Sequence, residues 1–268
     1  MTRTSLTNDT SELARRYDQI STERQFRSGK ALIAELGIVR GEHVLDIGSG
    51  TGLLAEYVAD LTGPDGMVLG LEPLPLRVEL AQARARPNLT FKVGSANELD
   101  WIADASFDVV YLNAVLHWLN ERQELTCQIF RIIRPGGRLG ISAASGEREG
   151  PIRNATLQVL RRAPYDQHLA KLTRIINRVS QPELETLLRT AGFTIKRLEL
   201  RDSLQHYPTP EAAIEFVEAS SFGNFLNHLP PELRPSARAA IAVELQQFVT
   251  PAGIPRESTR IVAVALKP

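Results

Sequence analysis

Three glycines spaced two residues apart follow a short apolar run that ends in an acid. The segment reads His43-Val44-Leu45-Asp46-Ile47-Gly48-Ser49-Gly50-Thr51-Gly52. Glycine permits positive φ and a close approach of the backbone to a ligand, and a helix that follows directs its free N–H groups at that ligand. The carboxylate of Asp46 is poorly placed to face a pyrophosphate and suits a cationic ligand better. The spacing therefore predicts a strand that turns into a ligand-binding loop.

Four further segments combine an apolar run with polar or turn residues. Met67-Val68-Leu69-Gly70-Leu71-Glu72 ends in an acid about 20 residues past the loop, where a carboxylate accepts ribose hydroxyls in nucleotide sites. Phe91-Lys92-Val93 leads into Gly94-Ser95-Ala96-Asn97, and Phe107 to Asn113 forms a fourth run. Arg134-Pro135-Gly136-Gly137 predicts a turn before a fifth strand over Arg138 to Ile141. Strands that alternate with helical segments are typical of a parallel sheet.

The loop itself separates two classes of nucleotide-binding protein. A dinucleotide fingerprint needs glycine or alanine three residues beyond Gly50, where this chain has Leu53. A nicotinamide oxidoreductase is therefore the less favoured interpretation. Acid-x-Gly-x-Gly-x-Gly instead resembles motif I of the class I S-adenosylmethionine (SAM) methyltransferases of the UbiE-like, methyltransferase type 11 group, whose ligand carries an ammonium and a sulfonium. Ser95 stands where that family writes the Asp of Gly-Asp-Ala.

The resemblance covers residues 43 to 141 and implies both a fold and a cofactor. The fold is a doubly wound, seven-stranded, mostly parallel Rossmann-like sheet with helical insertions after strands five and six. The cofactor is SAM, which leaves as S-adenosylhomocysteine. The residues that the resemblance assigns to it are Tyr17, Asp46, Gly48, Ser49, Gly50, Gly52, Leu53, Glu72, Pro73, Leu74, Ser95, Ala96, Asn97, Asn113, Ala114 and Val115. Within this set Glu72 is the ribose ligand.

Leu116-His117-Trp118 follows the fourth strand and resembles the subgroup that includes the trans-aconitate and juvenile hormone acid methyltransferases. Those enzymes esterify carboxylates, so the resemblance makes Trp118 and Gln25 hydrogen-bond donors to a carboxylate. It also makes His117 and Trp118 the candidate catalytic residues. His117 is either a general base or a group that orients a ligand. The candidate substrate-binding residues are Gln25, Phe26, His117, Trp118, Phe222 and Phe225. Core packing for the aromatics, and an exposed amide for Gln25, are the competing interpretations.

The pattern favours one methyltransferase domain over residues 1–268. A helical cover over 1–41 precedes the cofactor-binding core over 42–145, and helical insertions over 146–181 and 205–257 are expected to roof the methyl group. Helices are expected at about 51–62, 75–85, 121–133, 152–163, 167–178, 182–190, 210–219 and 231–248. Strand six is expected over 193–200, with strand seven over 261–266 as its antiparallel partner.

The amino-acid composition limits the classes of molecule that this protein is expected to bind. The 268 residues carry 31 basic and 31 acidic side chains, so no basic surplus favours nucleic acid. Residues 1–11 are polar and no apolar run is long enough to cross a membrane, so we expect a cytoplasmic protein that acts on a small molecule as a monomer or homodimer. The single cysteine, Cys127, excludes an internal disulfide and a multi-thiolate metal site, and no metal is expected. Cys127 falls within a predicted helix and is expected to be buried or half-buried. Carboxyl O-methylation of a small, partly apolar metabolite is favoured slightly over C-, N- or S-methylation, and a catalytically silent SAM-binding regulator is the alternative to an enzyme.

Overall fold

The computed structural model describes residues 26–145, 150–168, 178–219, 226 and 229–268. These residues fall into two compact units. The sheet unit contains residues 26–145, 178–200 and 260–268, and the helical unit contains 150–168, 201–219, 226 and 229–259. The long strands β6 (Thr194–Tyr207) and β7 (Ile254–Leu266) have residues in both units. A single domain with a cover and two insertions remains a prediction from the sequence.

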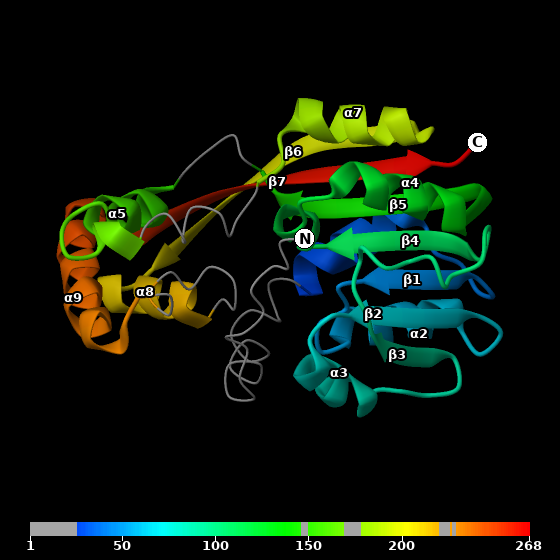
Figure 1. The fold of residues 1–268 in the computed structure, drawn as a ribbon, viewed down its shortest axis with the longest axis horizontal. Coiled ribbons are helices and arrows are strands. Elements are labelled where there is room, and N and C mark those ends of the chain that lie inside the picture. Colours follow the sequence, from blue (N-terminus) through cyan, green and yellow to red (C-terminus); the bar gives the residue numbers. More distant parts are fainter. Residues whose placement is uncertain (1–25, 146–149, 169–177, 220–225, 227–228) are drawn as a thin grey trace. The chain divides into compact units, whose positions relative to one another are not determined.

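A seven-stranded sheet in the order β3-β2-β1-β4-β5-β7-β6 forms the sheet unit (Figure 1). Its other strands are β1 (His43–Ile47), β2 (Met67–Glu72), β3 (Leu89–Val93), β4 (Phe107–Asn113) and β5 (Ile133–Ala144). β1 pairs in parallel with β2 and β4, β4 pairs in parallel with β5, and β7 runs antiparallel to β5. The direction of strand order reverses between β1 and β4, and ligands of open α/β sheets bind at such a switch point. The predicted doubly wound, mostly parallel fold is confirmed.

Helices cover both faces of the sheet because each buried strand presents apolar side chains alternately to either side. One face carries the helix over residues 26–36, α2 (Leu53–Thr62) and α3 (Pro75–Gln82), which share a core with Val44, Val109 and Tyr111. The other face carries α4 (Arg122–Ile132) and α7 (Gln181–Ala191), which share a core with Leu45 and Val110. Strand β1 is therefore enclosed, and only its carboxyl end opens into a loop.

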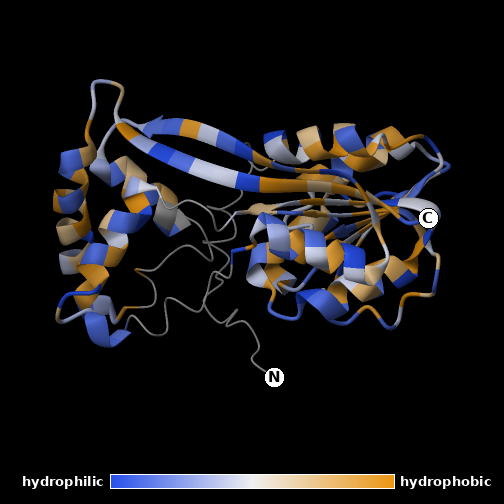
Figure 2. Ribbon diagram, turned by 90° about the horizontal axis from the view of Figure 1, so that it is seen from above, coloured by the Kyte–Doolittle hydropathy of each residue, from blue (hydrophilic) through white to orange (hydrophobic). Residues whose placement is uncertain are grey.

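Several predicted boundaries differ from the structure. β6 and β7 are longer than the expected 193–200 and 261–266, because mainly polar and mostly part-exposed or exposed residues continue both strands. Figure 2 shows hydrophilic residues along much of β6, in contrast to the hydrophobic carboxyl half of β7. The expected helix over 231–248 consists of η3 (Pro231–Leu233), α9 (Arg234–Leu245) and η4 (Gln246–Phe248). Cys127 lies in α4 but is exposed, because it points away from the face that packs on the sheet. Most of the helix expected over 167–178 lies outside the described residues.

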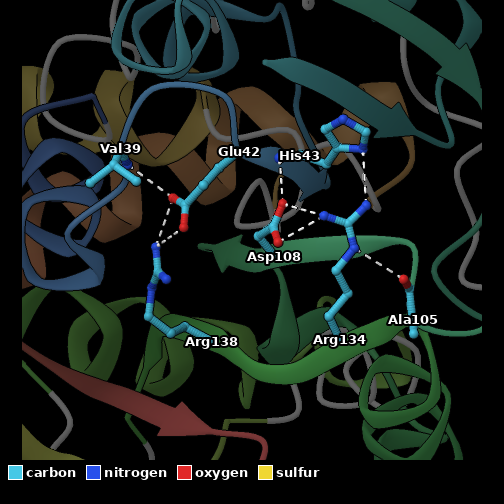
Figure 3. Close-up of polar contacts among 7 residues, drawn as sticks. All are labelled: Val39, Glu42, His43, Ala105, Asp108, Arg134 and Arg138. Atoms are coloured by element: carbon cyan, nitrogen blue, oxygen red, sulfur yellow. Dashed lines mark hydrogen bonds and ion pairs between the residues drawn. The ribbon is translucent and has the colours of Figure 1, made fainter. Parts of the chain in front are cut away.

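Charged side chains form ion pairs and hydrogen bonds between the amino ends of β1, β4 and β5 (Figure 3). The guanidinium of Arg138 lies 2.8 Å from both carboxylate oxygens of Glu42, and that of Arg134 lies 2.8 Å from both oxygens of Asp108. The backbone N–H of His43 donates to Asp108 at 2.8 Å. These groups satisfy one another at the sheet edge opposite the carboxyl end of β1, so they are structural.

The helical unit has its own apolar core. α5 (Pro151–Leu160), α8 (Pro210–Ala219) and α9 contribute apolar side chains to it, and Ile254 at the start of β7 joins them. Its largest fully buried members include Leu160 and Leu245. Among the described residues, no helix is both long and apolar enough to cross a bilayer.

Candidate active site

The three loop glycines all have positive φ, but they differ in what surrounds them. Gly48 has φ 78°, and a Cβ added there would lie 2.3 Å from Cγ2 of Val115. Gly52 has φ 86°, and its Cβ would lie 2.6 Å from the Phe91 ring. Gly50 has φ 57° and nothing within 4 Å of an added Cβ. The outer glycines are therefore required by packing, whereas Gly50 faces open space.

Glu72 connects this loop to the end of β2. Its side chain is buried, and its two carboxylate oxygens accept the backbone N–H groups of Gly50 at 3.0 Å and Leu74 at 3.2 Å. The loop N–H groups at Gly48 and Ser49 donate to the carbonyl of Leu71. The acid that the sequence assigns to the ribose thus lies beside the glycine loop, at the switch point of the sheet.

Asp46 is a buried acid at the carboxyl end of β1, and its side chain is 3% exposed. The pKa of its carboxyl is raised to about 7, chiefly by burial and also by the negative charge of Glu72, while the Tyr111 hydroxyl opposes this rise. A carboxyl with this pKa is partly protonated near neutral pH. A cation placed next to it would favour the ionised form.

The predicted adenine side is formed by residues after β2 and β3. Ser95 Oγ accepts the backbone N–H of Asn97 at 3.2 Å, so this serine closes a turn in the place where the family has an aspartate. Ala96 is buried in the core and Asn97 is exposed. Among the remaining members of the predicted set, Pro73 and Leu53 are half-buried and Leu74 is buried.

The carboxyl end of β4 carries a network that sequence reasoning missed. Asn113 Oδ1 accepts from Nη2 of Arg260 at 3.1 Å, and Nε of Arg260 donates to the hydroxyl of Ser142 at 2.9 Å. Ala114 has φ 63°, and its N–H donates to the carbonyl of Ser142 at 2.7 Å. The helix over 26–36 approaches here, since a Cβ on Gly29 would lie 3.0 Å from Nδ2 of Asn113. Arg260 comes from β7, so only the strand order brings it to this edge.

His117 is a buried, neutral imidazole. The backbone N–H of Ala144 donates to its Nδ1 at 3.2 Å, which assigns the ring proton to Nε2. Burial, together with the positive charges of Arg260, Arg122 and Arg178, lowers the pKa of His117 to about 3. With Nδ1 engaged and Nε2 protonated, neither nitrogen has a free lone pair. The arrangement favours the orienting role over that of a general base.

Of the other residues predicted to bind the substrate, Trp118 and Phe26 already contact neighbouring side chains or backbone. The indole Nε1–H of Trp118 donates to the carbonyl of Ala114 at 3.1 Å, and the ring lies 4.6 Å from that of His117. Phe26 packs edge-on against Tyr57 of α2, with ring centroids 6.0 Å apart. Tyr17, Gln25, Phe222 and Phe225 lie outside the described residues.

Replacing His117 by glutamine changes the pH dependence of stability. The folded pKa of about 3 lies below the ordinary value of 6.5, so the unfolded chain takes up this proton first. The wild type therefore loses stability as pH falls from 6.5 towards 3, by up to about 1.4 kcal/mol per pH unit from this group. Urea unfolding of both proteins between pH 4.5 and 7.5 measures it. A wild-type-minus-variant difference that stays constant over this range contradicts the assignment.

The strand order, the glycine loop and the acid that ends β2 together define the class I SAM-dependent methyltransferase fold. A family model described as "Methyltransferase domain" matches residues 45–141. A solved structure of a methyltransferase from Bacillus halodurans superposes with a TM-score of 0.60 at 16% identity, covering 90% of this chain and 98% of that chain.

Sequence relatives extend the match beyond the core. A demethylmenaquinone methyltransferase of Renibacterium salmoninarum is 32% identical over 61% of this chain and 71% of that protein. A trans-aconitate 2-methyltransferase of Methylobacterium radiotolerans is 27% identical over 81% of this chain and 82% of that protein. An arsenite methyltransferase of Halobacterium salinarum is 37% identical over 38% of this chain, and the match spans only 27% of that protein. The chain belongs to the class I SAM-dependent methyltransferases, and SAM is its cofactor.

Proposed function

We propose that this SAM-dependent methyltransferase of small molecules esterifies a carboxylate on a small, partly apolar acid. Methyl transfer is an in-line displacement at a sulfonium, and a carboxylate reaches the site already ionised. Such an acceptor needs no general base. The proposal rests on His117. This buried imidazole is neutral, and its Nδ1 accepts a backbone N–H, so it has no free lone pair with which to act as a general base. The positive charges of Arg178 and Arg260 near His117 favour an anionic acceptor over a cationic one, while Arg122 pairs with Glu183.

The cofactor is assigned to the loop between β1 and α2. The backbone at Gly48 and Gly50 receives the amino-acid tail, with Asp46 beneath it for the ammonium. Glu72 accepts the ribose hydroxyls, and the turn at Ser95 borders the adenine. When bound, SAM supplies the electrophilic methyl group. Alignment of donor and acceptor can account for roughly 7 to 11 kcal/mol of the barrier, so a site that positions both does much of the catalysis.

Residues Asn113 to Trp118 are assigned to the border between cofactor and acceptor. Nε2–H of His117 can donate to an acceptor oxygen and orient it. We assign the Trp118 ring, and not its N–H, to the acceptor side, since its N–H already donates to Ala114. The similarity to a trans-aconitate 2-methyltransferase supports an oxygen acceptor. A cytoplasmic location, a monomeric or homodimeric state and the absence of a nucleic-acid partner stay predictions.

The stability of the methylated product in alkali shows whether the acceptor is a carboxylate. The purified protein is incubated with methyl-labelled SAM and a panel of small carboxylic acids, and we expect a labelled product that releases methanol in alkali, as methyl esters do. A labelled product that resists alkali indicates C-, N- or S-methylation and contradicts the carboxylate assignment. No labelled product from any acceptor, together with normal S-adenosylhomocysteine binding, supports the silent SAM-binding regulator.

A further inference from the structure

Asp46 occupies the centre of a row of side chains that crosses the sheet. Its register partner on β2 is Gly70, and its partner on β4 is Tyr111. Residues paired in this way project from the same face, so the carboxyl of Asp46 has an empty glycine position on one side and a tyrosine on the other. The Tyr111 side chain is 0% exposed.

Two buried hydroxyls lie beside this row of side chains, and neither meets the distance and angle of a full hydrogen bond with any described residue. One belongs to Tyr111. The other belongs to Ser49, whose Oγ lies 2.8 Å from the place a Cβ on Gly70 would take. The Tyr111 hydroxyl interacts with Asp46 strongly enough to oppose the rise in its pKa, yet it lies outside full hydrogen-bond geometry. Buried hydroxyls without partners are costly, which points to a group that this site still has to receive.

The charges around Asp46 favour the binding of a cation. Glu72 and Tyr111 are the titratable groups that act on its carboxyl. Three charged side chains on the helices over this face have other contacts: Lys30 lies over the Tyr57 ring, Glu35 pairs with Arg197, and Glu56 pairs with Arg84. Arg77 is buried in α3 and is not among the groups that shift the pKa of Asp46. The carboxyl thus has an acid and a phenol as its titratable neighbours.

We propose that Tyr111 is a positioning residue for the cofactor's ammonium group, because its hydroxyl orients the Asp46 carboxylate that receives this ammonium. The inference rests on the proposed placement of the amino-acid tail at the glycine loop. In the free protein Asp46 is partly protonated near pH 7. The ammonium favours the carboxylate, so cofactor binding releases the Asp46 proton to the solvent, and the Tyr111 hydroxyl then donates to the new charge.

Proton release makes the affinity depend on pH. Below the pKa of free Asp46, each pH unit lowers the affinity for a ligand with an ammonium by up to about tenfold. The Tyr111→Phe variant lacks the hydroxyl that stabilises the carboxylate, so it binds S-adenosylhomocysteine about tenfold more weakly at pH 7. The midpoint of its pH profile also moves upwards. Methylthioadenosine has no ammonium, and its affinity is the same for both proteins and across pH.

Isothermal titration calorimetry of the full chain measures these affinities between pH 5.5 and 7.5, below the pKa of most α-amino groups. Buffers of different ionisation enthalpy report the protons released. Tyr165→Phe is the matched control, because its hydroxyl donates to Ser236 in the helical unit and has no part in the proposed contact. Thermal unfolding of the free Tyr111→Phe protein should stay close to that of the wild type, since the hydroxyl that is lost makes no full hydrogen bond to a described residue.

Several results overturn the inference. One is a wild-type affinity for S-adenosylhomocysteine that is flat with pH and involves no proton release, and this result needs no variant. A second is a Tyr111→Phe protein whose S-adenosylhomocysteine affinity depends on pH as in the wild type. A third is a variant that loses as much affinity for methylthioadenosine as for S-adenosylhomocysteine, because such a loss indicates a general structural effect. A wild-type protein that binds neither ligand contradicts the cofactor placement itself, so the two failures are distinguishable.

Discussion

Replacing Gly50 by leucine abolishes S-adenosylhomocysteine binding and leaves the protein folded. Nothing lies within 4 Å of an added Cβ at this position, so the side chain enters open space and displaces no neighbour. The left-handed backbone, with φ 57°, costs about 1–2 kcal/mol for a residue with a Cβ, which a folded domain of this size can tolerate. The same open space is the one assigned to the amino-acid tail of the cofactor. We expect affinity to fall at least about 100-fold, which is about 2.7 kcal/mol.

Gly37 supplies a matched control for the backbone strain. It also has φ 57° and nothing within 4 Å of an added Cβ, but it follows the helix over residues 26–36. Gly37→Leu should lower the melting temperature as much as Gly50→Leu and bind S-adenosylhomocysteine like the wild type. Calorimetry at one pH measures both variants. Undiminished binding by a folded Gly50→Leu protein contradicts the placement of the tail.

Removing the carboxylate of Glu72 should weaken S-adenosylhomocysteine binding as much as Gly50→Leu does. Glu72→Ala deletes the proposed acceptor of the ribose hydroxyls and leaves the buried N–H of Leu74 without its carboxylate partner. It also frees the N–H of Gly50, which holds the loop against β2. We expect at least about a 100-fold loss of affinity, because hydrogen bonds to a charged group contribute about 1.5–3 kcal/mol each. Unlike Tyr111→Phe, this change should weaken methylthioadenosine as much as S-adenosylhomocysteine, since both ligands carry the ribose.

Two further variants sharpen this test. Glu72→Gln keeps one oxygen acceptor and should lose less affinity than Glu72→Ala. Glu56→Ala removes a carboxylate of α2 that pairs with Arg84 at 2.7 Å, and it should bind like the wild type because partly exposed ion pairs contribute little. Normal binding of S-adenosylhomocysteine by a folded Glu72→Ala protein places the ribose elsewhere.

The sequence predicts the central strands well because of where they lie. β1, β2 and β4 are covered on both faces, so each is a mainly apolar run with a polar or acidic residue at or next to its carboxyl end. β6 beyond Leu200 is different. Its residues are polar and mostly exposed, so neither alternation nor an apolar run identifies them as a strand. Hydrogen bonding to β7 holds that stretch, and pairing between strands about 50 residues apart leaves no local pattern.

Contacts between distant segments also limit how much of the site the sequence predicts. Glycine spacing and the acid at position 72 are local signals, and the structure brings both to one edge of the sheet. The contact of Arg260 with Asn113 joins residues 147 positions apart, and the pairing of Tyr111 with Asp46 depends on strand register. The state of His117 depends on a backbone N–H from β5 and on charges from three other segments. Residue type alone therefore suggests a base, whereas the surroundings favour an oriented hydrogen-bond donor.

A crystal structure with bound S-adenosylhomocysteine tests the central claim most directly. We expect the ribose hydroxyls on the carboxylate of Glu72 and the amino-acid tail over Gly48 to Gly52, with its ammonium towards Asp46. A ligand bound at any other edge of the sheet, or a ribose that makes no contact with Glu72, contradicts the account.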